Sequence, residues 1–145
     1  MKVEQLSIFL ENKTGRLAKV TQVLAEGTVN ILALSLADTS DFGILRLIVD
    51  DCAKARAVLK DNGFTVGITH VVAVAAPHKP GGLNGILQLL NGRGISVEYM
   101  YAIMQKGENA VLVIRLDCLD AAIEVLRGTG VSLLSHAELC GNMPC

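Results

Sequence analysis

The spacing of hydrophobic positions changes in a fixed order along the first half of the chain. Leu6, Ile8 and Leu10 alternate with other residues, which predicts a β-strand, and the stretch that follows has apolar side chains at helical spacing. The predicted elements are strands at 4–10, 29–37 and 43–50 with a turn at 38–41, helices at 16–26 and 52–61, and a strand that begins at Phe64. The predicted order is therefore βαββαβ.

The second half of the chain repeats the first at an offset of 66 residues, which becomes 67 after the second strand. The matched pairs include Lys13 with Lys79, Gly15 with Gly81, Leu17 with Leu83, Asp50 with Asp117 and Gly63 with Gly130. We expect an α+β fold of two ferredoxin-like βαββαβ units in tandem, at 1–68 and 69–145, the second with a short C-terminal tail. Each unit has an antiparallel sheet with both helices on one face.

In such a unit the first and third strands are central, so the second strand, 29–37, lies at an edge of the sheet. This strand is apolar and long, and an uncovered apolar edge pairs readily with another strand. We therefore expect the second strands to lie at interfaces between units, and the protein to be a homodimer.

The composition of the chain argues against nucleic acid and membrane as partners. The 145 residues carry a net charge of −1 and no Trp, so the chain lacks the basic and aromatic surface that binds nucleic acid. No apolar stretch reaches the ~20 residues that span a bilayer, and no secretory signal begins the chain, so we expect a cytoplasmic protein that binds neither nucleic acid nor membrane.

The four cysteines form no C-x-x-C pair, which argues against a disulfide framework and against a metal site. Cys52 and Cys118 are expected to be buried or half-buried at the starts of helices. Cys140 and Cys145 lie in a Gly/Asn/Pro-containing tail, which we expect to be dispensable for binding. A thiol-based metal or redox role for this pair is the alternative, although its spacing lacks a partnering His or Cys cluster. No cofactor motif is present.

Two turns, NKTGRL at 12–17 and HKPGGL at 78–83, occupy equivalent places between a strand and a helix. The repeated glycine allows a positive φ or a close backbone approach, and the exposed amides of the following helix attract an anion. Neither turn has the pattern of a phosphate loop or a dinucleotide fold. They suit a small carboxylate better than a nucleotide, although a purely structural strand-to-helix turn remains the alternative.

The stretch from ENKTGRLAKVTQVLAEGTVNI to GILRLIVDD resembles an ACT domain, the small-molecule-binding regulatory module of amino-acid metabolism, and the second half resembles it more faintly. The first copy matches the family pattern at Gly15, Leu17, Asn30 and Ile31, while Asn12 and Thr14 replace the usual acid and proline. The second copy matches at Pro80, Gly81 and Leu83, while His78 and Ser96 replace the acid and the asparagine. Whether one copy or both bind a ligand stays open.

The resemblance implies that an amino acid binds between the first turn of one unit and the second strand of its neighbour. Backbone amides near Gly15 or Gly81 and polar side chains such as Asn30 would meet the ligand. The candidate ligand-binding residues are Asn12, Thr14, Gly15, Arg16, Leu17, Asn30, Ile31, His78, Pro80, Gly81, Gly82, Leu83, Ser96 and Val97.

No Ser/His/Asp or Cys/His set is suggested by the sequence, so the chain is not expected to be an enzyme. We expect a free amino-acid sensor that regulates a separate enzyme or regulatory partner. One alternative is a protein-interaction subunit with a vestigial ligand site. A second is a small acylphosphatase-like hydrolase using Arg16 and Asn30, which lacks the glycine-rich pattern of that family.

Overall fold

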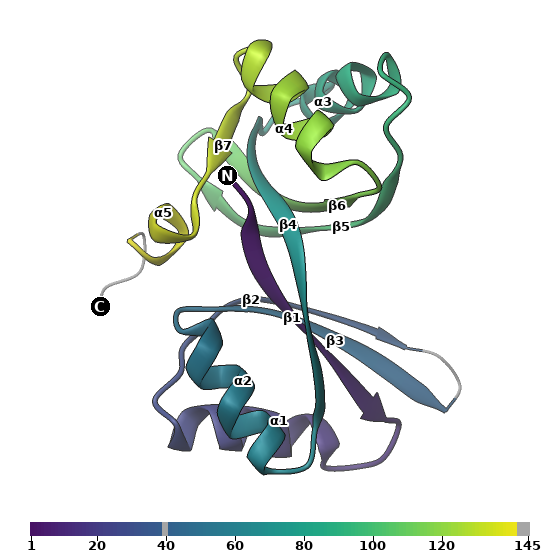
Figure 1. Cartoon of the computed structure of the whole chain (residues 1–145). Helices are drawn as coiled ribbons and strands as arrows, with labels where there is room; N and C mark the ends of the chain where they lie inside the picture. Colours follow the sequence, from purple (N-terminus) through teal and green to yellow (C-terminus); the bar gives the residue numbers. More distant parts are fainter. Residues whose placement is uncertain (39–40, 142–145) are drawn as a thin grey trace. The chain divides into compact units, whose positions relative to one another are not determined.

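The computed structural model describes residues 1–38 and 41–141 and shows two compact units (Figure 1). The N-terminal unit is Glu4–Thr69, and the C-terminal unit joins Met1–Val3 to His70–Cys145. The division falls inside one long strand, β4 (Thr65–Pro77), whose first part belongs to one unit and whose second part belongs to the other. Thr39 and Ser40 of the predicted turn, and Cys145, lie outside the described residues.

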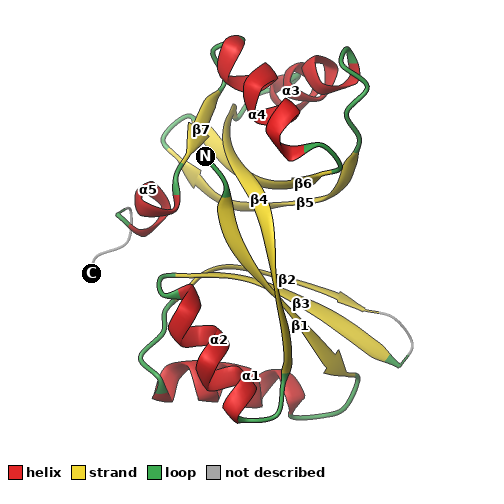
Figure 2. Ribbon diagram, in the orientation of Figure 1, coloured by secondary structure: helices red, strands yellow, loops and turns green. Residues whose placement is uncertain are grey.

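The N-terminal unit has the predicted βαββαβ order (Figure 2). Its elements are β1 (Val3–Glu11), α1 (Arg16–Glu26), β2 (Ile31–Asp38), β3 (Phe42–Val49), α2 (Cys52–Asp61) and the first part of β4. The strands lie in the order β2-β3-β1-β4, with β3 antiparallel to both β1 and β2. The first and third strands are therefore central and the second strand is at the edge, as predicted.

The C-terminal unit repeats this architecture. It consists of the second part of β4, followed by α3 (Gly82–Asn91), β5 (Val97–Lys106), β6 (Asn109–Leu116), α4 (Leu119–Gly128), β7 (Ser132–Leu134) and α5 (His136–Cys140). Both β6 and β7 pair with β4, and β5 forms the edge beyond β6. The short helix α5 was not expected in the tail. It begins at a capping box in which Ser135 and Glu138 exchange hydrogen bonds.

Each unit buries its own core between the helices and one face of the sheet. In the N-terminal unit, the alternating residues Leu6, Ile8 and Leu10 pack with Val20 and Leu24 of α1. In the C-terminal unit, the equivalent Val72, Val74 and Ala76 pack with Ile86 and Leu90 of α3. In each unit, the side chains at alternating strand positions therefore pack against the side chains at helical spacing in one buried layer.

The cysteines differ in burial. Cys52 is buried at the start of α2, as expected. Burial is the main cause that raises the pKa of its thiol to about 11, and a hydrogen bond with Glu4 is the second. The expectation for Cys118 was wrong because this residue is exposed. It is the N-cap of α4 and precedes the amphipathic helical pattern, so nothing in that pattern turns its side chain toward the core. Cys140 is half-buried at the end of α5.

Candidate ligand-binding turns

The first turn, which connects β1 to α1, is held by three backbone hydrogen bonds. The N–H of Asn12 donates to the Asp41 carbonyl oxygen at 3.0 Å, and that of Lys13 donates to Glu11 at 2.8 Å. The N–H of Arg16 then donates to the Lys13 carbonyl oxygen at 3.3 Å. Gly15 has φ +89° and is the N-cap of α1, so the predicted positive φ is confirmed.

The second turn reproduces these contacts. The N–H of His78 donates to the Glu108 carbonyl oxygen at 2.8 Å, that of Lys79 to Pro77 at 2.9 Å, and that of Gly82 to Lys79 at 3.0 Å. Gly81 has φ +84° and is the N-cap of α3. The internal repeat therefore extends to the individual hydrogen bonds of the turn.

Neither turn supplies a side chain to cap the helix that follows it. Gly15 and Gly81 have no side chain to offer, and the first turns of α1 and α3 contain no acidic residue. By contrast, the side chain of Asp51 accepts the Lys54 amide at the start of α2. The helix starts at the two glycines are thus open to an external acceptor such as a carboxylate.

A hollow of about 190 Å³ lies beside the first turn, inside the N-terminal unit. The described residues that line it come from β1, the turn, α1, β2 and β3, and are Leu10, Glu11, Asn12, Lys13, Arg16, Leu17, Leu36 and Gly43. Leu36 lies opposite Leu45 in the sheet, on the side that faces the helices. The hollow therefore combines an apolar wall with a charged rim.

The charged residues of the first turn are arranged in two groups. Lys13 Nζ lies 2.9 Å from Glu11 Oε2, and this hydrogen-bonded ion pair lowers the pKa of the Glu11 carboxyl. The Arg16 guanidinium lies over the ring of Phe64, with its carbon 4.8 Å from the ring centroid. The Nε atom of Arg16 is buried and has no hydrogen-bond partner among the described residues.

The second turn has a different lining. A wider hollow of about 590 Å³ is bordered by Pro77, His78, Lys79, Gly107, Glu108 and Asn109. Gly82 occupies the place of Arg16 and is buried, and a Cβ there would overlap the Pro77 carbonyl oxygen. Gly82 is thus required by a close backbone approach, while Gly81 supplies the positive φ.

The remaining predicted residues fall into two places. Thr14 and Pro80 lie in the turns, and Leu17 and Leu83 are partly exposed in the first turns of their helices. Asn30, Ile31, Ser96 and Val97 lie at the starts of β2 and β5, near the last residues of β3 and β6. Because β1 and β2 are both antiparallel to β3, the start of β2 is at the opposite end of the sheet from the turn. A single unit therefore does not bring Asn30 to Gly15.

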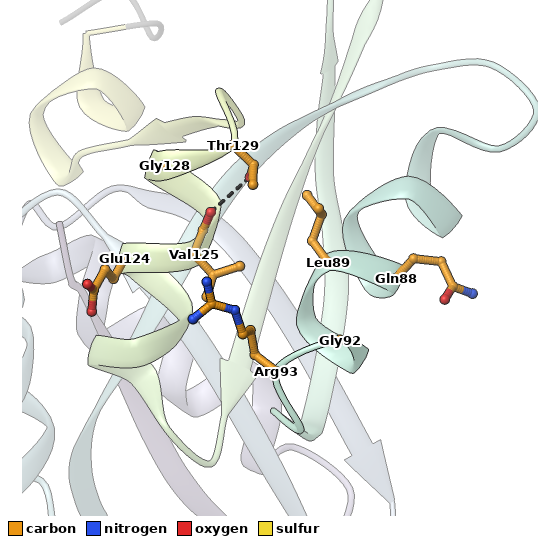
Figure 3. A pocket seen from close by; sticks show the side chains of 8 residues that line it. All are labelled: Gln88, Leu89, Gly92, Arg93, Glu124, Val125, Gly128 and Thr129. Atoms are coloured by element: carbon orange, nitrogen blue, oxygen red, sulfur yellow. Dashed lines mark hydrogen bonds between the residues drawn. The ribbon is translucent and has the colours of Figure 1, made fainter.

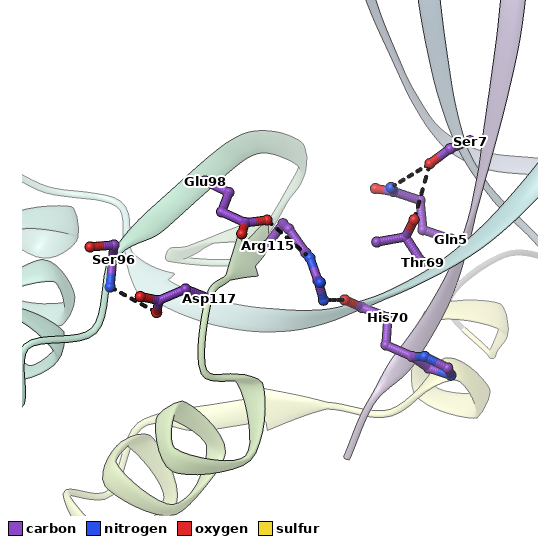
Figure 4. A network of polar contacts seen from close by, with 8 residues as sticks. All are labelled: Gln5, Ser7, Thr69, His70, Ser96, Glu98, Arg115 and Asp117. Atoms are coloured by element: carbon purple, nitrogen blue, oxygen red, sulfur yellow. Dashed lines mark hydrogen bonds and ion pairs between the residues drawn. The ribbon is translucent and has the colours of Figure 1, made fainter.

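The backbones at Asn30 and Ser96 have a matched structural role. The N–H of Asn30 donates to Asp50 Oδ1 at 2.9 Å, and the Asp50 N–H donates back to the Asn30 carbonyl oxygen at 3.1 Å. Ser96 and Asp117 form the same pair, at 3.0 and 3.2 Å (Figure 4). The repeated aspartate thus fixes where the second strand of each unit begins.

The polar groups of Figure 4 also tie strands together within each unit. In the C-terminal unit, Arg115 of β6 donates from Nε to Glu98 of β5 at 3.2 Å and from Nη1 to the His70 carbonyl oxygen at 2.8 Å. In the N-terminal unit, the hydroxyls of Ser7 and Thr69 lie 3.3 Å apart. These contacts satisfy polar groups on the sheet.

A further hollow, of about 490 Å³, lies between α3 and α4 and contains none of the predicted site residues (Figure 3). It is lined by Gln88, Leu89, Gly92, Arg93, Glu124, Val125, Gly128 and Thr129. Within residues 1–38 and 41–141, no three His, Cys, Asp or Glu side chains are grouped as a metal site. Among the helices that the structure describes, none is long and apolar enough to cross a membrane.

Sequence reasoning missed the hollow itself. Leu10, Glu11, Lys13, Leu36 and Gly43 were not among the predicted site residues, although they line it. The pairing of β3 with β1 brings Gly43 to the turn, and the pairing of β2 with β3 brings Leu36 there. The hydrophobic pattern does not specify these registers residue by residue.

The described chain is thus a tandem pair of ferredoxin-like units, each with a glycine turn before a helix that no side chain caps. A family model of the ACT domain pair matches residues 1–143, and the chain belongs to that family. The crystal structure of protein BT0572 from Bacteroides thetaiotaomicron is 48% identical, with a TM-score of 0.91 and 96% of each chain covered.

Two regulatory subunits of aspartate kinase share the fold at low identity. The ligand-free subunit from Thermus thermophilus is 16% identical with a TM-score of 0.64, covering 88% of this chain and 92% of its own. The subunit from Thermus flavus is 18% identical with a TM-score of 0.60, and the match covers 86% of this chain and 90% of the subunit. No curated protein matches the chain.

Proposed function

We propose that this protein is a non-catalytic sensor that binds a free amino acid and passes its occupancy to a separate enzyme or regulatory partner. ACT domain pairs are regulatory modules, and membership of the family supports this class of function. The observation that carries the proposal is the open N-terminus of α1 beside a hollow with a cationic and apolar lining. This arrangement has the chemistry that a zwitterion with a small side chain requires.

The size and charge of the hollow agree with such a ligand. Its volume of about 190 Å³ is below the range of roughly 300–1,000 Å³ typical of sites for drug-sized ligands. A carboxylate at the uncapped start of α1 would gain about 0.3–1 kcal/mol, and up to ~2 kcal/mol if partly buried. A single amino acid therefore suits the first turn better than a nucleotide.

The ligand is proposed to lie between the turn of one unit and the second strand of a neighbouring unit in a homodimer. Asn30 and Ile31, or Ser96 and Val97, would then reach the turn from that neighbour. The edge position of β2, with Leu34 and Leu36 largely exposed, supports pairing with another chain. Light scattering at micromolar concentration is expected to give a dimer, and a monomer with and without ligand would count against this arrangement.

A thermal-shift screen of the free amino acids tests the proposal, followed by calorimetry on the best ligand. Asn30→Ala removes a hydrogen bond to a charged group, about 1.5–3 kcal/mol, and should weaken binding tenfold or more. The Asn30 backbone pairing with Asp50 does not need the amide side chain, so the fold should be retained. Ser96→Ala is the matched variant in the second copy and shows whether that copy contributes. Unchanged affinity in both variants would contradict a role for the second strands.

An interaction subunit with a vestigial site is the second candidate function. It is favoured by four large apolar side chains that are about half exposed in the N-terminal unit: Phe9, Leu34, Leu36 and Phe42. This alternative predicts a stable oligomer or partner complex with no response to any amino acid. The same screen therefore separates the two functions.

A further inference from the structure

We infer that, of the two turns, only the N-terminal one holds a ligand, and that Arg16 binds the ligand carboxylate. The ligand is an amino acid with an aliphatic side chain. The inference rests on the proposed function and specifies its ligand class. It comes from differences between two turns whose backbone hydrogen bonds are the same.

Arg16 has one part of its guanidinium held and another part unsatisfied. The group stacks on Phe64, while its buried Nε donor has no partner among the described residues. A buried donor without an acceptor is unfavourable, and a guanidinium presents its donors in a planar fork that matches a carboxylate. Arg16 also lines the hollow beside the turn. A carboxylate bound in that hollow would pair with the Arg16 guanidinium.

The other charged residues of the rim are already paired and complete a site for a zwitterion. Lys13 is engaged by Glu11 at 2.9 Å, so Arg16 is the cation better placed to receive a ligand anion. The Glu11 carboxylate also lines the hollow and offers an acceptor for the ligand ammonium. The two ends of an amino acid would therefore meet opposite charges at one rim.

The apolar lining determines the expected side chain. Leu10, Leu17 and Leu36 border the hollow from a strand, a helix and the edge strand, respectively. Burial of a methylene contributes about 0.8 kcal/mol, whereas a polar side chain among three leucines would lose hydrogen bonds to water. Valine, leucine, isoleucine and methionine are the expected ligands, in preference to acidic or amide side chains.

The second turn keeps Lys79 and Leu83 in the places of Lys13 and Leu17 but lacks the other groups that line the first hollow. Gly82 replaces Arg16, and the overlap of a Cβ with Pro77 excludes a side chain there without a change of backbone. Val131 replaces Phe64, as the equivalent backbone bonds to Leu126 and Leu59 show. The remaining replacements are Pro77 for Glu11, Ala76 for Leu10 and Ala102 for Leu36. The C-terminal turn keeps the backbone geometry of the repeat, and Lys79 and Glu108 border its hollow, but it has no counterpart of Arg16, Glu11 or the Phe64 ring.

Isothermal titration calorimetry of the full chain with L-leucine, L-alanine and L-aspartate tests the inference. The wild type is expected to bind one L-leucine per chain and L-aspartate far more weakly. Arg16→Gln should weaken L-leucine binding tenfold or more, Arg16→Lys less, and Arg93→Gln, in the hollow between α3 and α4, not at all. Circular dichroism establishes that each variant is folded.

A second variant keeps the test informative if Arg16→Gln does not fold. Leu36→Ala is expected to weaken L-leucine binding about tenfold and L-alanine binding little, because only the longer side chain reaches Leu36. Two equivalents per chain, preference for L-aspartate, or unchanged affinity in Arg16→Gln would overturn this inference while leaving amino-acid binding intact. Failure of the wild type to bind any free amino acid would instead refute the proposed function, and the inference with it.

Discussion

Gly15 in the first turn and Gly82 in the second turn are required for different physical reasons, and this difference predicts different costs of substitution. Gly15 has φ +89°, but an added Cβ would meet no atom within 4 Å. Gly82 has no positive φ, but its added Cβ would overlap the Pro77 carbonyl oxygen. Gly15→Ala therefore tests backbone strain alone, while Gly82→Ala tests a steric conflict.

The two costs can be worked out separately. An alanine in the left-handed conformation destabilises the folded state by about 1–2 kcal/mol. Replacing glycine also reduces the conformational entropy of the unfolded chain, which stabilises the protein by about 0.4–1 kcal/mol. Gly15→Ala should thus destabilise by about 1 kcal/mol. Gly82→Ala forces the turn apart, at about 1–3 kcal/mol for overpacking. The substitution should also break the hydrogen bond from the Lys79 N–H to the Pro77 carbonyl oxygen, which contributes about 1 kcal/mol. The expected loss of folding free energy is therefore about 2–4 kcal/mol.

Urea unfolding followed by far-ultraviolet circular dichroism measures both costs, since the chain has no Trp for fluorescence. Gly85→Ala in α3 is a suitable control because its added Cβ meets nothing within 4 Å and the residue is helical, so stability should rise slightly. An unfolding free energy of Gly82→Ala equal to that of the wild type would refute the steric conflict at Gly82. A larger loss of unfolding free energy in Gly15→Ala than in Gly82→Ala would also contradict this prediction.

Two further predictions concern titrating groups. At pH 8, iodoacetamide should modify exposed Cys118 quickly and Cys52 hardly at all, because burial raises the pKa of the Cys52 thiol to about 11; equal labelling of the two peptides by mass spectrometry would contradict this. Lys13→Gln should raise the pKa of Glu11 toward the usual glutamate range in an NMR titration, because Lys13 holds that pKa down. Because the folded pKa is the lower one, the pair's small contribution to stability is present above the unfolded pKa and lost as the pH falls through the folded pKa. An unchanged Glu11 pKa would show that the ion pair does not form in solution.

Much of the fold was predictable because each unit keeps a regular hydrophobic period. The bounds of α1 and α2 match the predicted 16–26 and 52–61, and the glycine turns were found through the internal repeat. The second strand begins later than predicted, at Ile31. Asp50 binds the Asn30 backbone there, which is a long-range contact that periodicity does not contain. The helix α5 was missed although Ser135 and Glu138 have the spacing of a capping box.

The candidate site was predictable only in part. The pattern around Gly15 indicated an open helix start, which depends on local sequence alone. The contributions of Leu36 and Phe64 depend on strand register and on the return of the chain to the turn. These are tertiary features, and they distinguish two turns that are similar in sequence and backbone geometry.

Recognition of the free carboxylate of an amino acid is the property on which the proposed function depends. The most direct measurement is calorimetry of the wild-type chain with the best free amino acid from the thermal-shift screen and with its methyl ester. The ester keeps the side chain and ammonium but lacks the negative charge that the start of α1 and Arg16 attract. We predict saturable binding of the acid and at least tenfold weaker binding of the ester. Equal affinity for the two, or no binding of any free amino acid, would contradict the account.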